Sequence, residues 1–145
     1  MAYDPHAKRV ILHGGIRSAD RVPLTDTWAW TGAEWKLLTM EGPRTIFGAA
    51  ASALDSGIVL FGGHTLQGAT NSTWHWTGNL WRELTRTGPS ARTFPALATD
   101  VRNRRIYLIG GAAPDFSVSY TDLWYLDEAG VWTRVYERPA ATRAR

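Results

Sequence analysis

Cysteine is absent from this chain of 145 residues. Without a thiol, the protein has no disulfide framework, no thiolate metal ligand and no cysteine nucleophile. Long apolar runs are also absent, and none approaches the roughly 20 residues that cross a membrane as a helix. The N-terminal segment lacks the apolar core of a secretory signal peptide. We therefore expect no membrane partner, and the compartment stays open.

The motifs of common catalytic sites are missing as well. There is no Gly-x-Gly-x-x-Gly, no phosphate-loop signature, no His-Glu-x-x-His and no Gly-x-Ser-x-Gly. The four histidines (His6, His13, His64 and His75) lie in different segments, whereas a metal site needs three or four converging ligands. No carboxylate pair stands out as an acid and a base. We expect no metal and no cofactor, and the sequence leans away from an enzyme.

The charge balance is slightly basic, with a formal net charge of +3. Arginines gather at positions 102–105 and near the C-terminus. A basic surface attracts nucleic acid, but no nucleic-acid-binding motif accompanies these arginines. We interpret them as solvated side chains of exposed turns and expect no nucleic-acid partner.

A repeat is the main feature that the sequence does have. Three glycine pairs recur at intervals of about 48 residues; each closes an apolar run and is followed by two tryptophans. The repeated positions are Gly14 and Gly15 with Trp28 and Trp35, Gly62 and Gly63 with Trp74 and Trp81, and Gly110 and Gly111 with Trp124 and Trp132. Such self-similarity is typical of a repeat architecture.

Each repeat predicts four short antiparallel strands, which we call A to D in chain order. Strand A is rich in small residues, at about 47–54 and 94–99, and is expected to be innermost. Strand B is the apolar run; because it does not alternate, both of its faces are expected to be buried. The tryptophans of strands C and D would fill the gaps between sheets. The units are about 1–43, 44–89 and 90–139, with 140–145 beginning a further one.

This pattern resembles the kelch family. The resemblance rests on the apolar runs with their glycine pairs, on Asp26-Thr27-Trp28 and Asp122-Leu123-Trp124, and on the second tryptophan of each repeat. The motif Trp-x-Trp-Thr-Gly looks more like those of bacterial kelch proteins and of the central domain of galactose-oxidase-like proteins than like those of animal kelch proteins. The resemblance implies an all-β fold of three four-stranded antiparallel blades of a β-propeller. The copper and Tyr–Cys chemistry of galactose oxidase does not carry over, because cysteine is absent.

Three blades do not close a ring, since propellers have about 4–8. The chain begins and ends within strand A of adjoining repeats. Two interpretations stay open: a partial propeller, or one half of a six-bladed ring formed by a homodimer.

Kelch proteins usually bind partners through the rim formed by the B–C and D–A loops, so the resemblance places candidate ligand-binding residues there. The B–C loops at 16–25, 64–70 and 112–120 differ in sequence while their flanking strands repeat, which is typical of a binding scaffold. The candidates in these loops are Arg17, Arg21, His64, Gln67, Asp115, Phe116 and Tyr120.

Arginines also open the innermost strands, at Arg44 and Arg92, and Arg143 would do so in the next unit. In one interpretation they face the mouth of the channel and hold a carboxylate or an anionic side chain. In the other they bridge adjacent blades through Asp or backbone carbonyls.

Three functions follow as hypotheses. The first is a non-enzymatic recognition module that binds a protein or a small-molecule ligand at its loop rim. The second is a sugar-binding or sugar-isomerising kelch-type enzyme, for which Arg44, Arg92 and a carboxylate such as Glu41 or Asp115 must converge. The third is a fragment of a six- or seven-bladed propeller with no independent function.

Overall fold

The computed structural model describes residues 1–54 and 57–136, and it is all-β, as expected. Sheet 1 contains β1 (Ala2–Asp4), β2 (Arg9–Ile16), β3 (Pro23–Trp30) and β4 (Trp35–Thr39). Sheet 2 contains β5 (Ala50–Leu54), β6 (Gly57–Phe61), β9 (Thr73–Trp76) and β10 (Trp81–Thr85). Sheet 3 contains β11 (Ala96–Asp100), β12 (Arg105–Ile109), β13 (Leu123–Leu126) and β14 (Trp132–Tyr136). A small hairpin, β7 (His64–Thr65) with β8 (Gly68–Ala69), follows β6.

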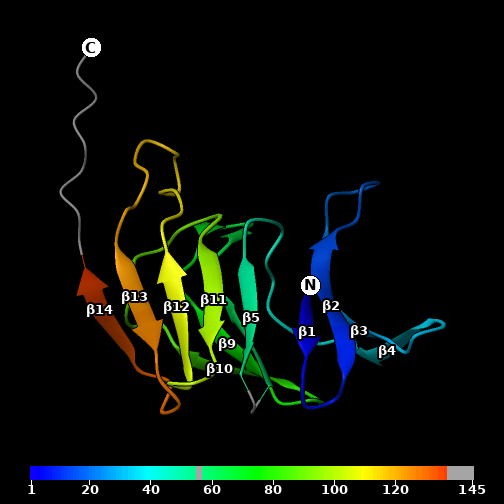
Figure 1. Cartoon of the computed structure of the whole chain (residues 1–145). Helices are drawn as coiled ribbons and strands as arrows, with labels where there is room; N and C mark the ends of the chain where they lie inside the picture. The colour runs from blue at the N-terminus through cyan, green and yellow to red at the C-terminus, as the bar shows by residue number, and fades with distance from the viewer. Residues whose placement is uncertain (55–56, 137–145) are drawn as a thin grey trace.

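Every four-stranded sheet is antiparallel and keeps its strands in chain order, which confirms the A-to-D prediction. The first strand of sheet 2, β5, contacts both β1 and β11, so neighbouring sheets meet along these inner strands (Figure 1). Each sheet thus has the strand order of a propeller blade, innermost strand first.

The inner strands begin later than the sequence predicts. β5 starts at Ala50 rather than 47, and β11 at Ala96 rather than 94. Gly48 and Phe94 adopt positive φ, at +70° and +54°, which interrupts the extended backbone. Phe47 and Thr93 instead form single bridges with His64 and Ala112 of the B–C loops.

The glycine pairs let the next D–A segment approach the end of strand B. Gly62 has φ +69°, and a Cβ there would lie 2.8 Å from the carbonyl oxygen of Arg92. The Gly63 amide donates to that same oxygen at 2.9 Å. A side chain at Gly62 would therefore push apart the segments that join sheets 2 and 3.

Two apolar clusters fill the spaces between the sheets. Ile11, Ala29, Ile58 and Trp76 lie between sheets 1 and 2; Val59, Phe61, Ile106, Leu108, Leu126 and Trp132 lie between sheets 2 and 3. The middle strand β6 is buried at all five positions, as its non-alternating sequence predicts. For β2 and β12 that prediction is wrong, because among the described residues each has a neighbouring sheet on one side only and keeps exposed positions.

The second tryptophans join neighbouring sheets, as expected. The indole N–H of Trp81 donates to the Thr27 hydroxyl of sheet 1 at 2.9 Å, and that of Trp132 donates to the Thr73 hydroxyl of sheet 2 at the same distance. Trp35 of sheet 1 has no preceding sheet among the described residues and is 41% exposed.

The outermost strand of each sheet carries one extra residue. The register between β3 and β4, between β9 and β10, and between β13 and β14 shifts at the same place in the three sheets. The extra residues are Leu38, Leu84 and Val135. Each shift is a β-bulge, which bends the strand and increases its twist.

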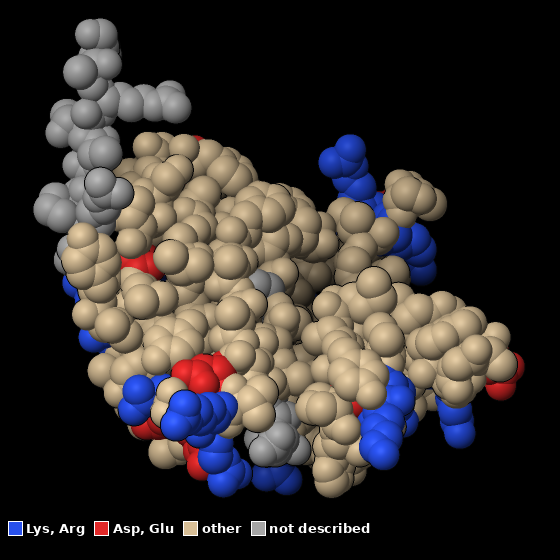
Figure 2. Space-filling view, viewed as in Figure 1, with Lys and Arg blue, Asp and Glu red and all other residues tan. Residues whose placement is uncertain are grey.

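The two ends of the molecule differ in character. The A–B turns of sheets 1 and 3 lie at the lower end of Figure 1 and the B–C loops at the upper end. On the face in Figure 2, Lys and Arg gather around the lower end, and the upper end is mostly neutral apart from the β2–β3 loop. In the described residues no helix is long and apolar enough to cross a membrane.

Candidate functional site

Four ring side chains form a row across the end where the B–C loops meet the D–A segments, which we call the rim. The Phe47 ring stacks on the His64 imidazole with 4.9 Å between centroids and lies 5.9 Å from the Phe94 ring. The Phe94 ring in turn lies 6.4 Å from that of Phe116. Phe47 and Phe94 belong to D–A segments, and His64 and Phe116 to B–C loops. We call these four residues the aromatic row.

The phenylalanines of the aromatic row project into solvent. Phe47, Phe94 and Phe116 are 44%, 60% and 57% exposed. Phe94 and Phe116 have φ of +54° and +59°, a region that bulky residues rarely adopt. The Phe94 amide is held there by the Gly48 carbonyl at 2.6 Å, and the Phe116 amide by the Ala113 carbonyl at 2.9 Å. A strained backbone that presents apolar rings to water is typical of a binding surface.

An apolar groove adjoins the row at Phe47. Its volume is about 380 Å³, and Ile16, Ser18, Arg21, Ile46 and Phe47 line it. The loop above it is fixed: the Arg17 guanidinium donates to both carboxylate oxygens of Asp20, at 2.9 and 2.7 Å. Arg21, at φ +56°, has no carboxylate partner among the described residues and leaves the groove with one positive charge.

Arg92 is fully buried, and its guanidinium ties the segment before β11 to sheet 3. Its guanidinium donates to both carboxylate oxygens of Asp122, at 2.6 and 2.9 Å, and to the Gly110 carbonyl at 2.9 Å. The Tyr120 ring covers it at 4.1 Å. Burial alone would raise the pKa of Asp122, but the hydrogen bonds from Arg92 and Trp124 outweigh it, and the pKa lies below its usual value. The guanidinium therefore bonds an Asp and a backbone carbonyl of its own unit rather than of an adjacent blade. Only the Arg92 backbone reaches the B–C loop of sheet 2, accepting from the Gly63 amide at 2.9 Å and donating to the Thr70 carbonyl at 3.3 Å.

Arg44 occupies a different place from Arg92. Arg44 lies three residues before the bridge at Phe47, whereas Arg92 lies one residue before the equivalent bridge at Thr93. The Arg44 side chain is exposed and lines a cavity of about 520 Å³, together with Gln67 of the B–C loop. Fully buried Arg92 does not line this cavity, so the two arginines do not share a site.

The carboxylates considered for acid–base chemistry do not join these arginines. Asp115 accepts hydrogen bonds from the Ser117 amide and hydroxyl, which lower its pKa. Glu41 lines a cavity of about 250 Å³ beside Trp81, which adjoins the Arg44 cavity at Gly42 and Trp74 but does not include Arg44. Arg143 lies outside the described residues. Within the described ranges, no group of three His, Cys, Asp or Glu could hold a metal ion.

Sequence reasoning placed His64 and Phe116 at the rim but missed Phe47 and Phe94. Both phenylalanines fell inside the predicted innermost strands. Phe47 precedes Gly48 and Phe94 precedes Pro95, two residues that interrupt strands, and this was the signal available in the sequence.

No protein-family model matches this chain, and no curated protein is similar to it.

Proposed function

We propose that this chain is a non-enzymatic recognition module of the kelch type that binds a protein segment at its rim. The observation that carries the proposal is the aromatic row, in which three phenylalanines from three separate connections come together in solvent. The repeat of glycine pairs and tryptophans, and the blade-like strand order, support the kelch assignment.

The chemistry of the rim favours a partner with apolar side chains next to an acidic one. Aromatic residues dominate the energetics of protein interfaces, where a central ring often contributes about 2 kcal/mol or more. The apolar groove beside Phe47 would take an aliphatic or aromatic side chain. Arg21 at its edge favours a carboxylate next to that side chain.

Selection from a random peptide library displayed on phage tests this function directly. We expect peptides that pair an aromatic or large aliphatic residue with Asp or Glu. The double variant Phe94→Ser and Phe116→Ser should bind the selected peptides at least tenfold more weakly, because two ring contacts are lost. Both side chains are exposed, so the variant should fold.

The matched control is Val101→Ser, an apolar residue of the A–B turn at the opposite end that is exposed at least as much as the two phenylalanines. It should leave peptide affinity unchanged. Failure to select any peptide, or equal affinity of the double variant and the wild type, would contradict the proposal.

The sugar-isomerising alternative gains no support from the described residues, because Arg44, Arg92, Glu41 and Asp115 do not line one cavity. That the chain is one part of a longer propeller stays a prediction.

A further inference from the structure

Sheets 1 and 3 hold a carboxylate at the same place, beside the first tryptophan. The indole N–H of Trp28 donates to Asp26 at 2.7 Å, and that of Trp124 donates to Asp122 at 2.7 Å. In sheet 3 the Arg92 guanidinium completes the arrangement from the other side. Sheets 1 and 3 therefore share a carboxylate-binding position. The donor is an indole N–H in both sheets, and a guanidinium is added in sheet 3.

Sheet 2 lacks that carboxylate. Ser72 stands two residues before Trp74, where the other sheets have Asp. The Ser72 hydroxyl accepts a hydrogen bond from Thr70 at 3.0 Å. Within the described part of the chain, the Trp74 indole N–H has no acceptor. The indole N–H of the first tryptophan therefore has a carboxylate acceptor in sheets 1 and 3 but not in sheet 2.

The cavity of about 520 Å³ lies at this position. Ser72, Trp74 and Arg44 line it, together with a second arginine, Arg86. This volume lies within the range of small-molecule sites, roughly 300–1,000 Å³. Trp74 and Arg44 are the two residue types that hold Asp122 in sheet 3, although Arg44 reaches the cavity from a different position of its segment.

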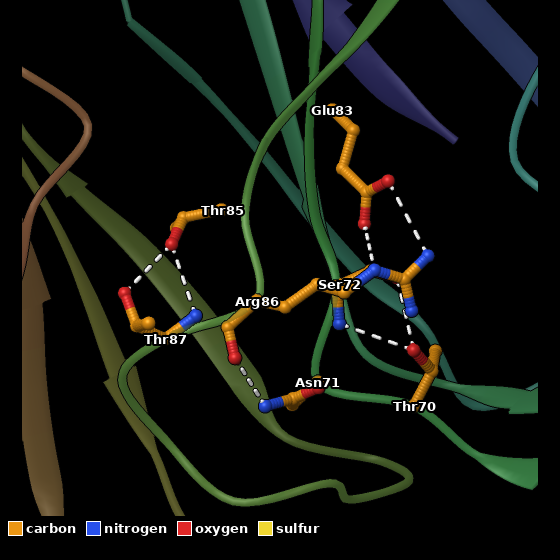
Figure 3. A network of polar contacts seen from close by, with 7 residues as sticks. All are labelled: Thr70, Asn71, Ser72, Glu83, Thr85, Arg86 and Thr87. Carbon is orange, nitrogen blue, oxygen red and sulfur yellow. Dashed lines mark hydrogen bonds and ion pairs between the residues drawn. The ribbon is translucent and has the colours of Figure 1, made fainter.

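The charge in the cavity is positive because only one of its arginines is neutralised. Figure 3 shows Arg86 paired with Glu83, at 2.6 Å between Arg86 Nε and Glu83 Oε1. The Asn71 amide donates to the Arg86 carbonyl and fixes that segment. The Arg44 guanidinium has no carboxylate partner among residues 1–54 and 57–136. An anion is the complement of this site.

Part of the remaining wall is polar and can bond hydroxyl groups, and the other part is Gly42, Pro43, Gly68 and Ala69. Hydroxyl and amide side chains from the segment before sheet 2 and from its B–C loop face the cavity: Thr45, Thr65, Gln67 and Thr70. The Thr65 and Thr70 hydroxyls are already ordered by hydrogen bonds within the loop, at 2.9 Å to the Gly68 carbonyl and 3.0 Å to Ser72. Preordered polar groups lower the cost of binding a polar ligand.

We propose that this cavity binds a small hydroxylated carboxylate, whose carboxylate takes the place that Asp122 has in sheet 3. The Trp74 indole N–H and the Arg44 guanidinium receive the carboxylate, and the threonine and glutamine side chains receive the hydroxyls. The site is separate from the aromatic row and does not rest on the proposed function.

The test is isothermal titration calorimetry of the whole chain with D-glucuronate. Three further probes dissect the recognition: D-glucose has hydroxyls without the carboxylate, whereas acetate and N-acetylglutamate amide have the carboxylate without hydroxyls. We expect D-glucuronate to bind at least tenfold more tightly than each. Equal affinity for D-glucose would overturn the carboxylate assignment. Equal affinity for N-acetylglutamate amide would point to an acidic side chain of a protein as the natural ligand and overturn the hydroxylated class.

Ser72→Asp is the decisive variant, because it restores the carboxylate that the other sheets carry. The new carboxylate should occupy the site and weaken D-glucuronate binding at least tenfold, while thermal unfolding stays at or above the wild-type temperature. Arg44→Gln removes an exposed charge and should give the same loss, so the test does not depend on how Ser72→Asp folds.

Two controls separate this site from its surroundings. Arg102→Ala changes an exposed arginine of the distant A–B turn and should bind D-glucuronate as the wild type does. The Phe94→Ser and Phe116→Ser double variant should also bind normally, which distinguishes failure at this cavity from failure at the rim. Absence of D-glucuronate binding by the wild type, or wild-type affinity in both Ser72→Asp and Arg44→Gln, would refute the proposal.

Discussion

The single hydrogen bond from Trp132 to Thr73 shows how a residue-scale contact joins two sheets. Thr73 is fully buried and Trp132 nearly so, and the indole N–H has no other acceptor among the described residues. A buried N–H that loses its acceptor still pays the free energy of desolvation, with no hydrogen bond to offset it. The same contact recurs between Trp81 and Thr27, so it belongs to the repeat rather than to one sheet.

We predict that Thr73→Val lowers the free energy of unfolding by about 1–3 kcal/mol, because valine keeps the shape but leaves the Trp132 N–H unpaired. Urea unfolding monitored by tryptophan fluorescence measures this change. Thr133→Val, at an exposed position of β14, is the matched control and should change stability by less than about 0.5 kcal/mol. A Thr73→Val protein as stable as the control would show that the bond contributes nothing.

The arginines show what residue-scale sequence reasoning could and could not reach. Arg44 directly follows Pro43, whereas Arg92 lies three residues after Pro89, so the difference between them was visible in the printed sequence. Which of the two is buried was not visible, because the partner of Arg92 lies 30 residues away. The acceptor, Asp122, lies just before β13, and only the packed sheet brings it close to Arg92.

At the scale of the element, the apolar runs predicted strand B well because local pattern and turn residues determine a hairpin. The ends of β5 and β11 were less accessible, since they depend on bridges to B–C loops distant in the chain. The contact of the four rings in one row could not be predicted for the same reason, although Gly48 and Pro95 marked where the two inner strands are interrupted. Four connections form it, and no single segment contains its pattern.

Strand β2 carries a histidine at the junction of sheets 1 and 2. The His13 ring packs 4.8 Å from the Trp81 ring, and its nitrogens lie 2.9 Å from the Thr27 hydroxyl and 3.0 Å from the Pro43 carbonyl. Burial lowers the pKa of His13 below its usual value, although the Pro43 carbonyl and the Asp26 charge act in the opposite direction. The folded protein therefore favours the neutral ring.

We predict that stability falls as the pH drops through the range just below 6.5. The unfolded chain takes up a proton at its ordinary pKa, whereas the folded chain does so only at lower pH, so acidification favours unfolding. The measurement is the free energy of unfolding at several pH values from 7 to 5. In His13→Gln the part of this slope due to His13 should disappear. The control His6→Gln, at an exposed position, should keep the wild-type slope; an unchanged slope in His13→Gln would refute the assignment.

At the scale of the whole molecule, the outer face of sheet 3 differs from the faces that are covered. Sheets 1 and 2 present Thr27 and Thr73 to the tryptophan of the next sheet, but sheet 3 has Leu123 at that position. Leucine accepts no hydrogen bond. Tyr107 and Tyr125 also replace Val59 and His75, and the Arg105 guanidinium lies 4.1 Å over the Tyr125 ring. A second copy joined head to tail would place Trp35 against Leu123.

We predict that the purified chain has the mass of a monomer, 16.1 kDa, rather than of a closed pair of about 32 kDa. The missing acceptor at Leu123 removes the contact that joins the other sheets. Size-exclusion chromatography with light scattering decides the matter. A stable wild-type species of about 32 kDa would support a six-bladed ring of two chains and contradict this prediction. Leu123→Thr supplies the missing acceptor and should have the same mass as the wild type if that ring forms without it.

The extra residue in each outermost strand affects how the protein behaves when it is crowded. Strands β4, β10 and β14 each have one edge left free by their own sheet, and a free edge invites a strand from another molecule. The bulges at Leu38, Leu84 and Val135 bend these short strands out of the flat shape that such addition requires. A straight, unbulged edge repeated three times would be a template for fibres. The bulges therefore oppose the addition of a strand from another molecule at the free edges of β4, β10 and β14.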